Sequence, residues 1–178
     1  MFASLSHCLH VCYLMEGIEE PFYTSNFSVV AARAAEQHGF RVPVKAQPRV
    51  NFAGLDQYEI RLQCAYIRSY LSKTLPEPEH DYVIAKYGVI RDVRMPAIDR
   101  WSIRAQSYCR MMDRRIIRDM AAHVFNRGRT GCNRISKKYH VSNAAVHQDI
   151  SRMHGECARV EAGIEARIGK YCDRNRFF

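Results

Sequence analysis

The chain has 178 residues, 47% of them hydrophobic, so it is long enough for one large domain or two small ones with real cores. No apolar run reaches the length of a membrane span, and the stretch at residues 5–15 has neither the basic start nor the cleavage site expected of a signal peptide. The formal net charge of +9 is concentrated in one half: residues 1–85 hold 7 Lys+Arg and 9 Asp+Glu, and residues 86–178 hold 20 and 9. Such a basic half is typical of a protein that binds a polyanion.

The seven cysteines indicate a reducing compartment. Their number is odd, most lie within helical patterns and none form a CxxC pair, so we expect reduced thiols in a cytoplasmic protein. His7, Cys8, His10 and Cys12 could gather a metal ion, but no second ligand pair follows at zinc-finger spacing, and we expect neither metal nor cofactor. Because Met15 begins a more ordinary sequence, a further hypothesis is that the first 14 residues extend the reading frame upstream.

Residues 1–54 are predicted to be an N-terminal extension and connector. The alanine-rich residues 28–38 favour a short helix that ends at Gly39. Pro43 and Pro48 then oppose both a helix and a central strand, so we expect residues 40–54 to be extended.

Residues 55–95 are predicted to be a helical body. Between residues 55 and 74 the apolar side chains recur at helical spacing, and the expected buried stripe is Ile60, Cys64, Ile67 and Leu71. A second helix should begin near Pro76 and Pro78, where proline is tolerated and the neighbouring acids suit the helix dipole, and should end at Gly88.

Residues 96–178 are predicted to be a basic DNA-binding domain. Pro96 is expected to open a helix that runs through Ile103. Residues 108–125 predict a supporting helix, packed across the two helices that follow it, with a buried stripe of Met112, Ile116, Met120 and Val124.

Residues 133–153 predict two short helices joined by a tight turn. Apolar residues recur at helical spacing before and after a break, and the spacing between Tyr139, Val141 and Val146 does not fit one continuous helix. The apolar residues are Ile135, Tyr139, Val141, Val146 and Ile150. Ser142 lies at the break and can cap a helix that begins at Asn143, runs to about Met153 and ends at Gly155. A last helix is expected at residues 156–170.

This pair predicts a helix-turn-helix that reads the major groove of DNA. The side chains expected to point outward and to bond base edges are Asn143, Ala144, His147, Gln148, Ser151 and Arg152. The cations placed to meet phosphates are Arg127, Arg129, Arg134, Lys137 and Lys138. Ser136 and His140 stand where many such units have a small residue and a glycine, so slightly looser packing is expected. The alternative is an ordinary amphipathic helical hairpin.

The motifs of several common enzyme classes are absent from the sequence. The chain contains no GxSxG elbow, no HExxH motif and no HxE followed by PCxxC. We therefore expect that the protein is not an enzyme.

Three stretches together resemble a known family. They are LDQYEIRLQCAYIRSYLSKTL, the EHDYVIAKYG segment, and the late RISKKYHVSNAAVHQDISRM, which is similar to the helix-turn-helix of sigma region 4. Over roughly residues 55–155 the chain resembles the Q-type transcription antitermination factors of phages and prophages, in particular the AlpA-like branch, without the zinc-binding insertion that some Q proteins carry.

The predicted elements together describe an all-α protein with an irregular N-terminal region and a C-terminal three-helix unit similar to sigma region 4. The resemblance further implies the function of a Q-type factor. Such a factor binds a promoter-proximal DNA element, joins paused RNA polymerase with its sigma factor, and blocks terminator hairpins at the RNA exit channel. The expected partners are double-stranded DNA, the polymerase and, by proximity, nascent RNA, with no membrane. Residues 55–95 would include the polymerase-facing part.

Two other functions remain open from the sequence. One is an ordinary helix-turn-helix transcription regulator in which residues 1–85 dimerise or bind an effector. The other is the small terminase subunit of a phage DNA-packaging motor, in which such units are arrayed in a ring. Oligomeric state separates them, because a ring favours packaging, a dimer favours the regulator, and a monomer that co-purifies with RNA polymerase favours antitermination.

Overall fold

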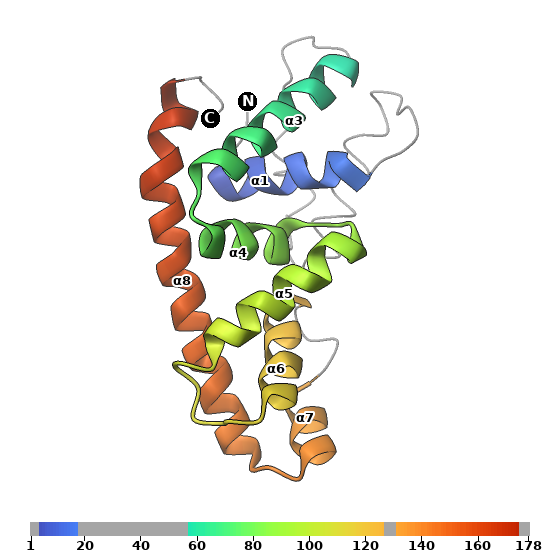
Figure 1. The fold of residues 1–178 in the computed structure, drawn as a ribbon, viewed down its shortest axis with the longest axis vertical. Helices are drawn as coiled ribbons and strands as arrows, with labels where there is room; N and C mark the ends of the chain where they lie inside the picture. Colours follow the sequence, from blue (N-terminus) through green and yellow to red (C-terminus); the bar gives the residue numbers. More distant parts are fainter. Residues whose placement is uncertain (1–3, 18–56, 127–130, 175–178) are drawn as a thin grey trace, which may run out of the picture. The chain divides into compact units, whose positions relative to one another are not determined.

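The computed structural model describes residues 4–17, 57–126 and 131–174 (Figure 1). Every regular element within these ranges is helical, which confirms the all-α class. The α-helices are α1 (Leu5–Leu14), α3 (Gln57–Thr74), α4 (Glu77–Tyr87), α5 (Arg91–Ala105), α6 (Arg114–Asn126), α7 (Cys132–Tyr139) and α8 (Asn143–Arg174), and a 3₁₀ turn, η1 (Met15–Gly17), follows α1. The helix expected at residues 28–38 and the connector at 40–54 lie outside the described residues.

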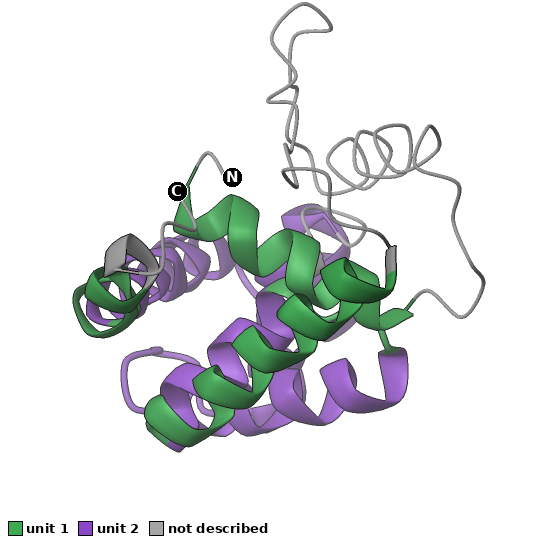
Figure 2. Cartoon of the chain, turned by 90° about the horizontal axis from the view of Figure 1, so that it is seen from above, with its two compact units in different colours: residues 1–76, 87–90, 164–178 green, residues 77–86, 91–163 purple. Residues whose placement is uncertain are grey.

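The chain divides into two compact units, coloured separately in Figure 2. Unit 1 comprises residues 1–76, 87–90 and 164–178, and unit 2 comprises residues 77–86 and 91–163. This division differs from the boundaries at residues 54 and 95 that the sequence suggested, because most of α4 groups with the helices that follow it.

Unit 1 is built on the packing of α1 against α3. The α3 stripe predicted from the sequence is buried, with at most 7% of any side chain exposed, at Ile60, Cys64, Ile67 and Leu71. The α1 residues Cys8, Val11 and Cys12 are fully buried. Because removing apolar surface from water is the main favourable term in folding, this shared core holds the two helices together. The prediction of α3 as an amphipathic helix is confirmed.

The start of the chain is more regular than the irregular N-terminal region expected from the sequence. Residues 5–17 are helical, and the Ser4 side chain caps α1 by accepting a hydrogen bond from the His7 N–H at 3.2 Å. At the other end of α1, the guanidinium of Arg68 donates to the Cys12 carbonyl at 2.5 Å. The sequence pattern missed this helix because it is apolar nearly all round and depends on packing against α3.

Unit 2 contains most of α4, all of α5, α6 and α7, and α8 as far as Gly163. α5 packs against α6, where the rings of Trp101 and Phe125 meet edge to face with centroids 4.9 Å apart. The guanidinium of Arg94 donates to the carbonyls of Ala85 and Phe125, each at 2.9 Å, and thereby satisfies backbone acceptors near the ends of α4 and α6.

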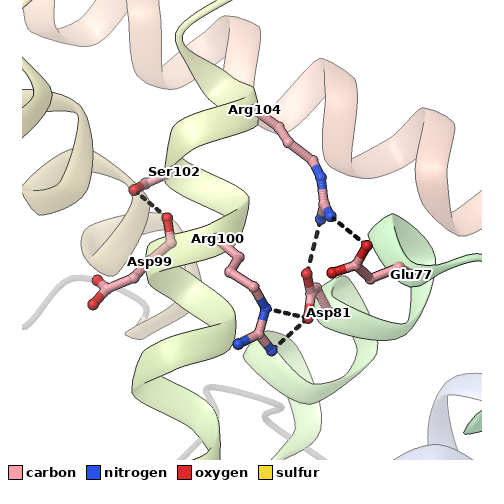
Figure 3. A network of polar contacts seen from close by, with 6 residues as sticks. All are labelled: Glu77, Asp81, Asp99, Arg100, Ser102 and Arg104. Atoms are coloured by element: carbon pink, nitrogen blue, oxygen red, sulfur yellow. Dashed lines mark hydrogen bonds and ion pairs between the residues drawn. The ribbon is translucent and has the colours of Figure 1, made fainter.

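A buried carboxylate joins α4 to α5 (Figure 3). Asp81 is 2% exposed, and its Oδ1 accepts hydrogen bonds from Arg100 Nε and Nη2 at 3.0 and 2.7 Å. Its Oδ2 accepts from Arg104 Nη1 at 2.9 Å. Nη2 of Arg104 lies 3.8 Å from Glu77 Oε2. The Asp81 carboxylate also raises the pKa of the Arg100 guanidinium. These contacts explain why α4 belongs with α5.

Pro96 does not open its helix. α5 begins at Arg91, so Pro96 is its sixth residue. A proline there removes the hydrogen bond to the Asp92 carbonyl, but both residues are exposed and water can take the place of the lost donor. The expectation that proline marks the first turn was therefore wrong at this position.

The supporting helix begins later than expected. α6 begins at Arg114, and residues 106–113 form a loop in place of its predicted first turns. Asp113 caps α6, since its Oδ1 accepts from the Arg115 N–H at 2.8 Å. Met112 is consequently 84% exposed and does not join the buried stripe, which consists of Ile116, Met120 and Val124.

Gly155 does not end a helix. α8 continues from Asn143 to Arg174 and merges the two helices predicted at residues 143–153 and 156–170. Glycine inside a helix costs roughly 1 kcal/mol relative to alanine. Met153 and Cys157, on either side of Gly155, are 0% and 7% exposed. Their burial outweighs the weak preference of glycine for a helix end.

Candidate nucleic-acid interface

A tight turn joins α7 to α8. His140 adopts the left-handed conformation, with φ 53° and ψ 39°. The N–H groups of His140 and Val141 both donate to the Ser136 carbonyl, and the Ser136 hydroxyl donates to the Val141 carbonyl at 2.6 Å. The left-handed conformation is the one for which glycine is usual, and it costs other residues about 1–2 kcal/mol. The break predicted at these residues is confirmed, and Ser136 closes the turn.

The buried faces of α7 and α8 consist mainly of apolar side chains. Ile135 on α7 is fully buried, as are Val146 and Met153 on α8, and Ile150 is 6% exposed. α7 also packs on α6. Tyr139 extends this contact, because its hydroxyl donates to Asp119 Oδ2 at 2.9 Å. The sequence spacing predicted this face correctly.

The outward face of α8 carries most of the residues predicted to contact bases. Asn143, Ala144, His147, Gln148 and Ser151 are all exposed. Arg152 is different, because its side chain is 29% exposed and its Nη1 lies 2.7 Å from Asp149 Oδ1. The exposed face exists as predicted, and its contact with DNA remains a prediction. For Arg152 the prediction carries a cost, since the guanidinium would share its charge between DNA and a buried acid.

Asp149 is a buried polar residue that the sequence pattern did not reveal. It is 1% exposed, and its carboxylate accepts hydrogen bonds from the N–H groups of Arg110 and Met111 at 3.0 Å. The thiol of Cys109 lies nearby. Burial, and to a smaller extent the Asp149 carboxylate, raises the pKa of this thiol to about 11. A signal was present: Asp149 stands three residues after Val146, on the inward face, where an acid requires a buried partner.

The cations predicted to meet phosphates differ in their surroundings. Arg134 and Lys137 on α7 are exposed, and neither forms an ion pair with any described residue. The Lys138 ammonium lies 2.7 Å from Asp119 Oδ2 and 4.8 Å from the centre of the Tyr139 ring. The hydrogen bond to Asp119 raises the pKa of Lys138. Arg127 and Arg129 lie outside the described residues.

Two other kinds of site are absent from the described part of the chain. Within residues 4–17, 57–126 and 131–174, no three His, Cys, Asp or Glu side chains gather in a way that would hold a metal ion. None of the described helices combines the length and apolar character needed to cross a membrane.

The sequence matches no protein-family model, and none of the curated proteins matches it significantly.

Proposed function

We propose that unit 2 binds double-stranded DNA with the outer face of residues 143–152 in the major groove. The observation that supports this most directly is the division of one helix into two faces directly after a tight turn. Val146, Ile150 and Met153 are buried, while the amide side chains of Asn143 and Gln148 are exposed. Asparagine and glutamine are the side chains that bond adenine with two hydrogen bonds in the major groove.

The distribution of charge supports the same proposal. Unit 2 contains 16 Lys+Arg and 10 Asp+Glu. Several of its acids are engaged by cations of the same unit, among them Asp81, Asp99, Asp119 and Asp149. Arg134 and Lys137 on α7 are exposed and form no ion pair with any described residue. Their positive charges are therefore available to bind phosphate. Arg127 and Arg129, which lie outside the described residues, complete the proposed phosphate-binding set.

Selection of bound sequences from a pool of random DNA duplexes tests the proposal. We expect the full-length protein to enrich one sequence, and Gln148→Ala to lose discrimination at one position of it. Lys137→Ala is the matched control, because a lost phosphate contact should weaken binding to all duplexes and lower the slope of log K against log salt by about one unit. An absence of enrichment, together with equal effects of both variants on selected and random DNA, would remove the groove-reading assignment.

The transcriptional role that we propose is antitermination, and it rests on the resemblance of residues 55–155 to Q-type factors. In this role the DNA-bound protein joins paused RNA polymerase and its sigma factor and prevents hairpin formation at the RNA exit channel. No catalytic step is required of the protein, and no cofactor is proposed.

Transcription in vitro separates this role from its alternatives. The template keeps the protein's own promoter region ahead of an intrinsic terminator, and readthrough is measured with and without the protein. We expect readthrough to rise, and Gln148→Ala to reduce the rise. Unchanged readthrough with retained DNA binding would favour an ordinary regulator, and a stable ring of many subunits in sizing would favour a DNA-packaging subunit.

A further inference from the structure

The loop at residues 106–113 is fixed at both of its ends. At its start, the N–H of Cys109 donates to the Ala105 carbonyl at 3.1 Å and continues the hydrogen bonding of α5. At its end, Asp113 caps α6 through the Arg115 N–H. Tyr108 packs its ring edge to face on Trp101, with centroids 6.2 Å apart. These contacts hold the first half of the loop and its last residue to unit 2.

The middle of this loop is bound to α8 by Asp149. The N–H of Arg110 lies 3.0 Å from each carboxylate oxygen, and the N–H of Met111 lies 3.0 Å from Oδ2. Hydrogen bonds to an ionised, buried carboxylate are stronger than those between neutral groups. Two consecutive backbone groups are thus anchored to the inward face of the same helix whose outward face carries Gln148.

This anchoring brings the Arg110 side chain to the proposed DNA-binding face. Arg110 is exposed, and its Nη1 donates to Gln148 Oε1 at 3.3 Å. A guanidinium has five N–H donors, so most of its donors remain available for a ligand. Arginine binds phosphate oxygens with two parallel hydrogen bonds, and one that flanks a helix in the major groove is suited to the DNA backbone.

We propose that Arg110 contacts a DNA phosphate from the loop at residues 106–113 and that Asp149 is the positioning residue that holds this loop beside α8. The inference rests on the proposed DNA binding of unit 2 and adds to it a second contacting element. The hydrogen bond between Arg110 and Gln148 also orients the Gln148 side chain, with its amide oxygen towards Arg110.

The first test compares Arg110→Ala with Arg91→Ala. Both variants remove one positive charge from unit 2. Arg91 is an exposed arginine at the start of α5, whereas the loop follows the other end of that helix, so only Arg110→Ala changes the loop. We expect Arg110→Ala to weaken binding to all duplexes by roughly fivefold to tenfold at 0.1 M salt and to lower the salt slope by about one unit. Arg91→Ala should change neither. Equal effects of the two variants would overturn the proposal, and so would a loss confined to the selected sequence.

The second test uses the sign of a charge change. Asp149→Asn makes the protein more positive, so simple electrostatics predicts tighter DNA binding. We expect weaker binding instead, because the loop is no longer held in place. Faster hydrogen exchange at the Arg110 and Met111 amides in free protein should accompany it. Tighter binding, or unchanged exchange at these amides in a folded variant, would show that Asp149 does not position the loop.

The proposed function and the loop contact can fail separately. If wild-type protein shows no salt-dependent binding to any duplex, both fall together. If wild-type protein binds and responds to Lys137→Ala but not to Arg110→Ala, only the inference about the loop is wrong.

Discussion

The ammonium group of Lys138 on α7 lies 2.7 Å from the carboxylate of Asp119 on α6. The same oxygen, Oδ2, accepts a hydrogen bond from the Tyr139 hydroxyl at 2.9 Å. Lys138 was predicted from the sequence to bind phosphate, and in the folded protein it already has an anionic partner. Its neighbour Lys137 is exposed and has no ion-pair partner among the described residues. The two lysines should therefore contribute differently to DNA binding.

Replacement of Asp119 tests this difference. Asp119→Asn keeps an oxygen that can accept from Tyr139 but frees the Lys138 charge. We expect DNA affinity to rise and the salt slope to increase by up to about one unit, because one more cation can release a counterion. Asp92→Asn is the control, since Asp92 is an exposed acid at the start of α5. Equal affinities for the two variants would mean that the pair with Asp119 does not limit Lys138.

The Asp81 network makes a prediction about stability. Asp81→Asn should lower the free energy of unfolding by about 2 kcal/mol, the range for hydrogen bonds to charged groups. Arg100 and Arg104 are 46% and 33% exposed, so water can solvate both guanidinium groups after the change. The loss should therefore be smaller than for a fully buried pair. Unfolding in urea, followed by helical circular dichroism, measures it.

The exposed ion pair between Asp99 and Arg118 provides a control for that variant. Their side chains are 37% and 54% exposed, and Arg118 Nε lies 2.5 Å from Asp99 Oδ1. Asp99→Asn should cost only about 0.5 kcal/mol, as exposed pairs do. Losses of equal size for Asp81→Asn and Asp99→Asn would contradict the importance assigned to the buried carboxylate.

The strained turn before α8 predicts a stabilising substitution. His140→Gly should raise the free energy of unfolding by about 1 kcal/mol, because glycine adopts a left-handed conformation without strain. For a chain of this size the midpoint of thermal unfolding should rise by roughly 2–4 °C. His147→Gly, at an exposed position within α8, should instead destabilise by roughly 0.5 kcal/mol. A fall in stability for both variants would mean that His140 is not strained.

The buried thiol of Cys157 predicts a loss of stability at high pH. Burial, aided by the nearby Glu161 carboxylate, raises its pKa from 9.0 to about 12. Above pH 9 the thiol of the unfolded chain loses its proton while the thiol of the folded protein keeps it. The contribution of Cys157 to the free energy of unfolding is therefore complete below pH 9 and is lost between pH 9 and 12. In urea unfolding between pH 9 and 12, the free energy of unfolding of Cys157→Ala should fall less steeply with pH than that of the wild type, by about 1.4 kcal/mol per pH unit. Parallel pH dependence of wild type and variant would exclude this role.

Periodicity in the sequence was sufficient where a helix has one buried stripe. The stripes of α3 and of the first part of α8 were predicted residue by residue, because burial repeats every three or four residues and polar residues occupy the other face. The turn at His140 and Ser142 was found for the same reason, since the spacing of Tyr139, Val141 and Val146 fits no single helix. The exposed candidate face followed from these assignments.

Signals at single residues were less reliable. Pro96 and Gly155 were interpreted as a helix start and a helix end, and both lie within helices. Pro96 costs α5 one backbone hydrogen bond, and Gly155 costs α8 about 1 kcal/mol of helix propensity. Burial of neighbouring side chains such as Met153 and Cys157 is worth more than that. A local preference is therefore overruled when the helix continues to cover a core.

The sequence by itself determined the helical class, the basic character of the second half, and which side chains of residues 143–151 face outward. These properties depend on composition and on spacing within one helix. Only the tertiary structure decided that α1 packs on α3, that Asp119 engages Lys138, and that Arg110 bonds both Asp149 and Gln148. Such contacts join residues 19 to 56 positions apart, and their energy comes from burial and charge pairing that no local pattern contains.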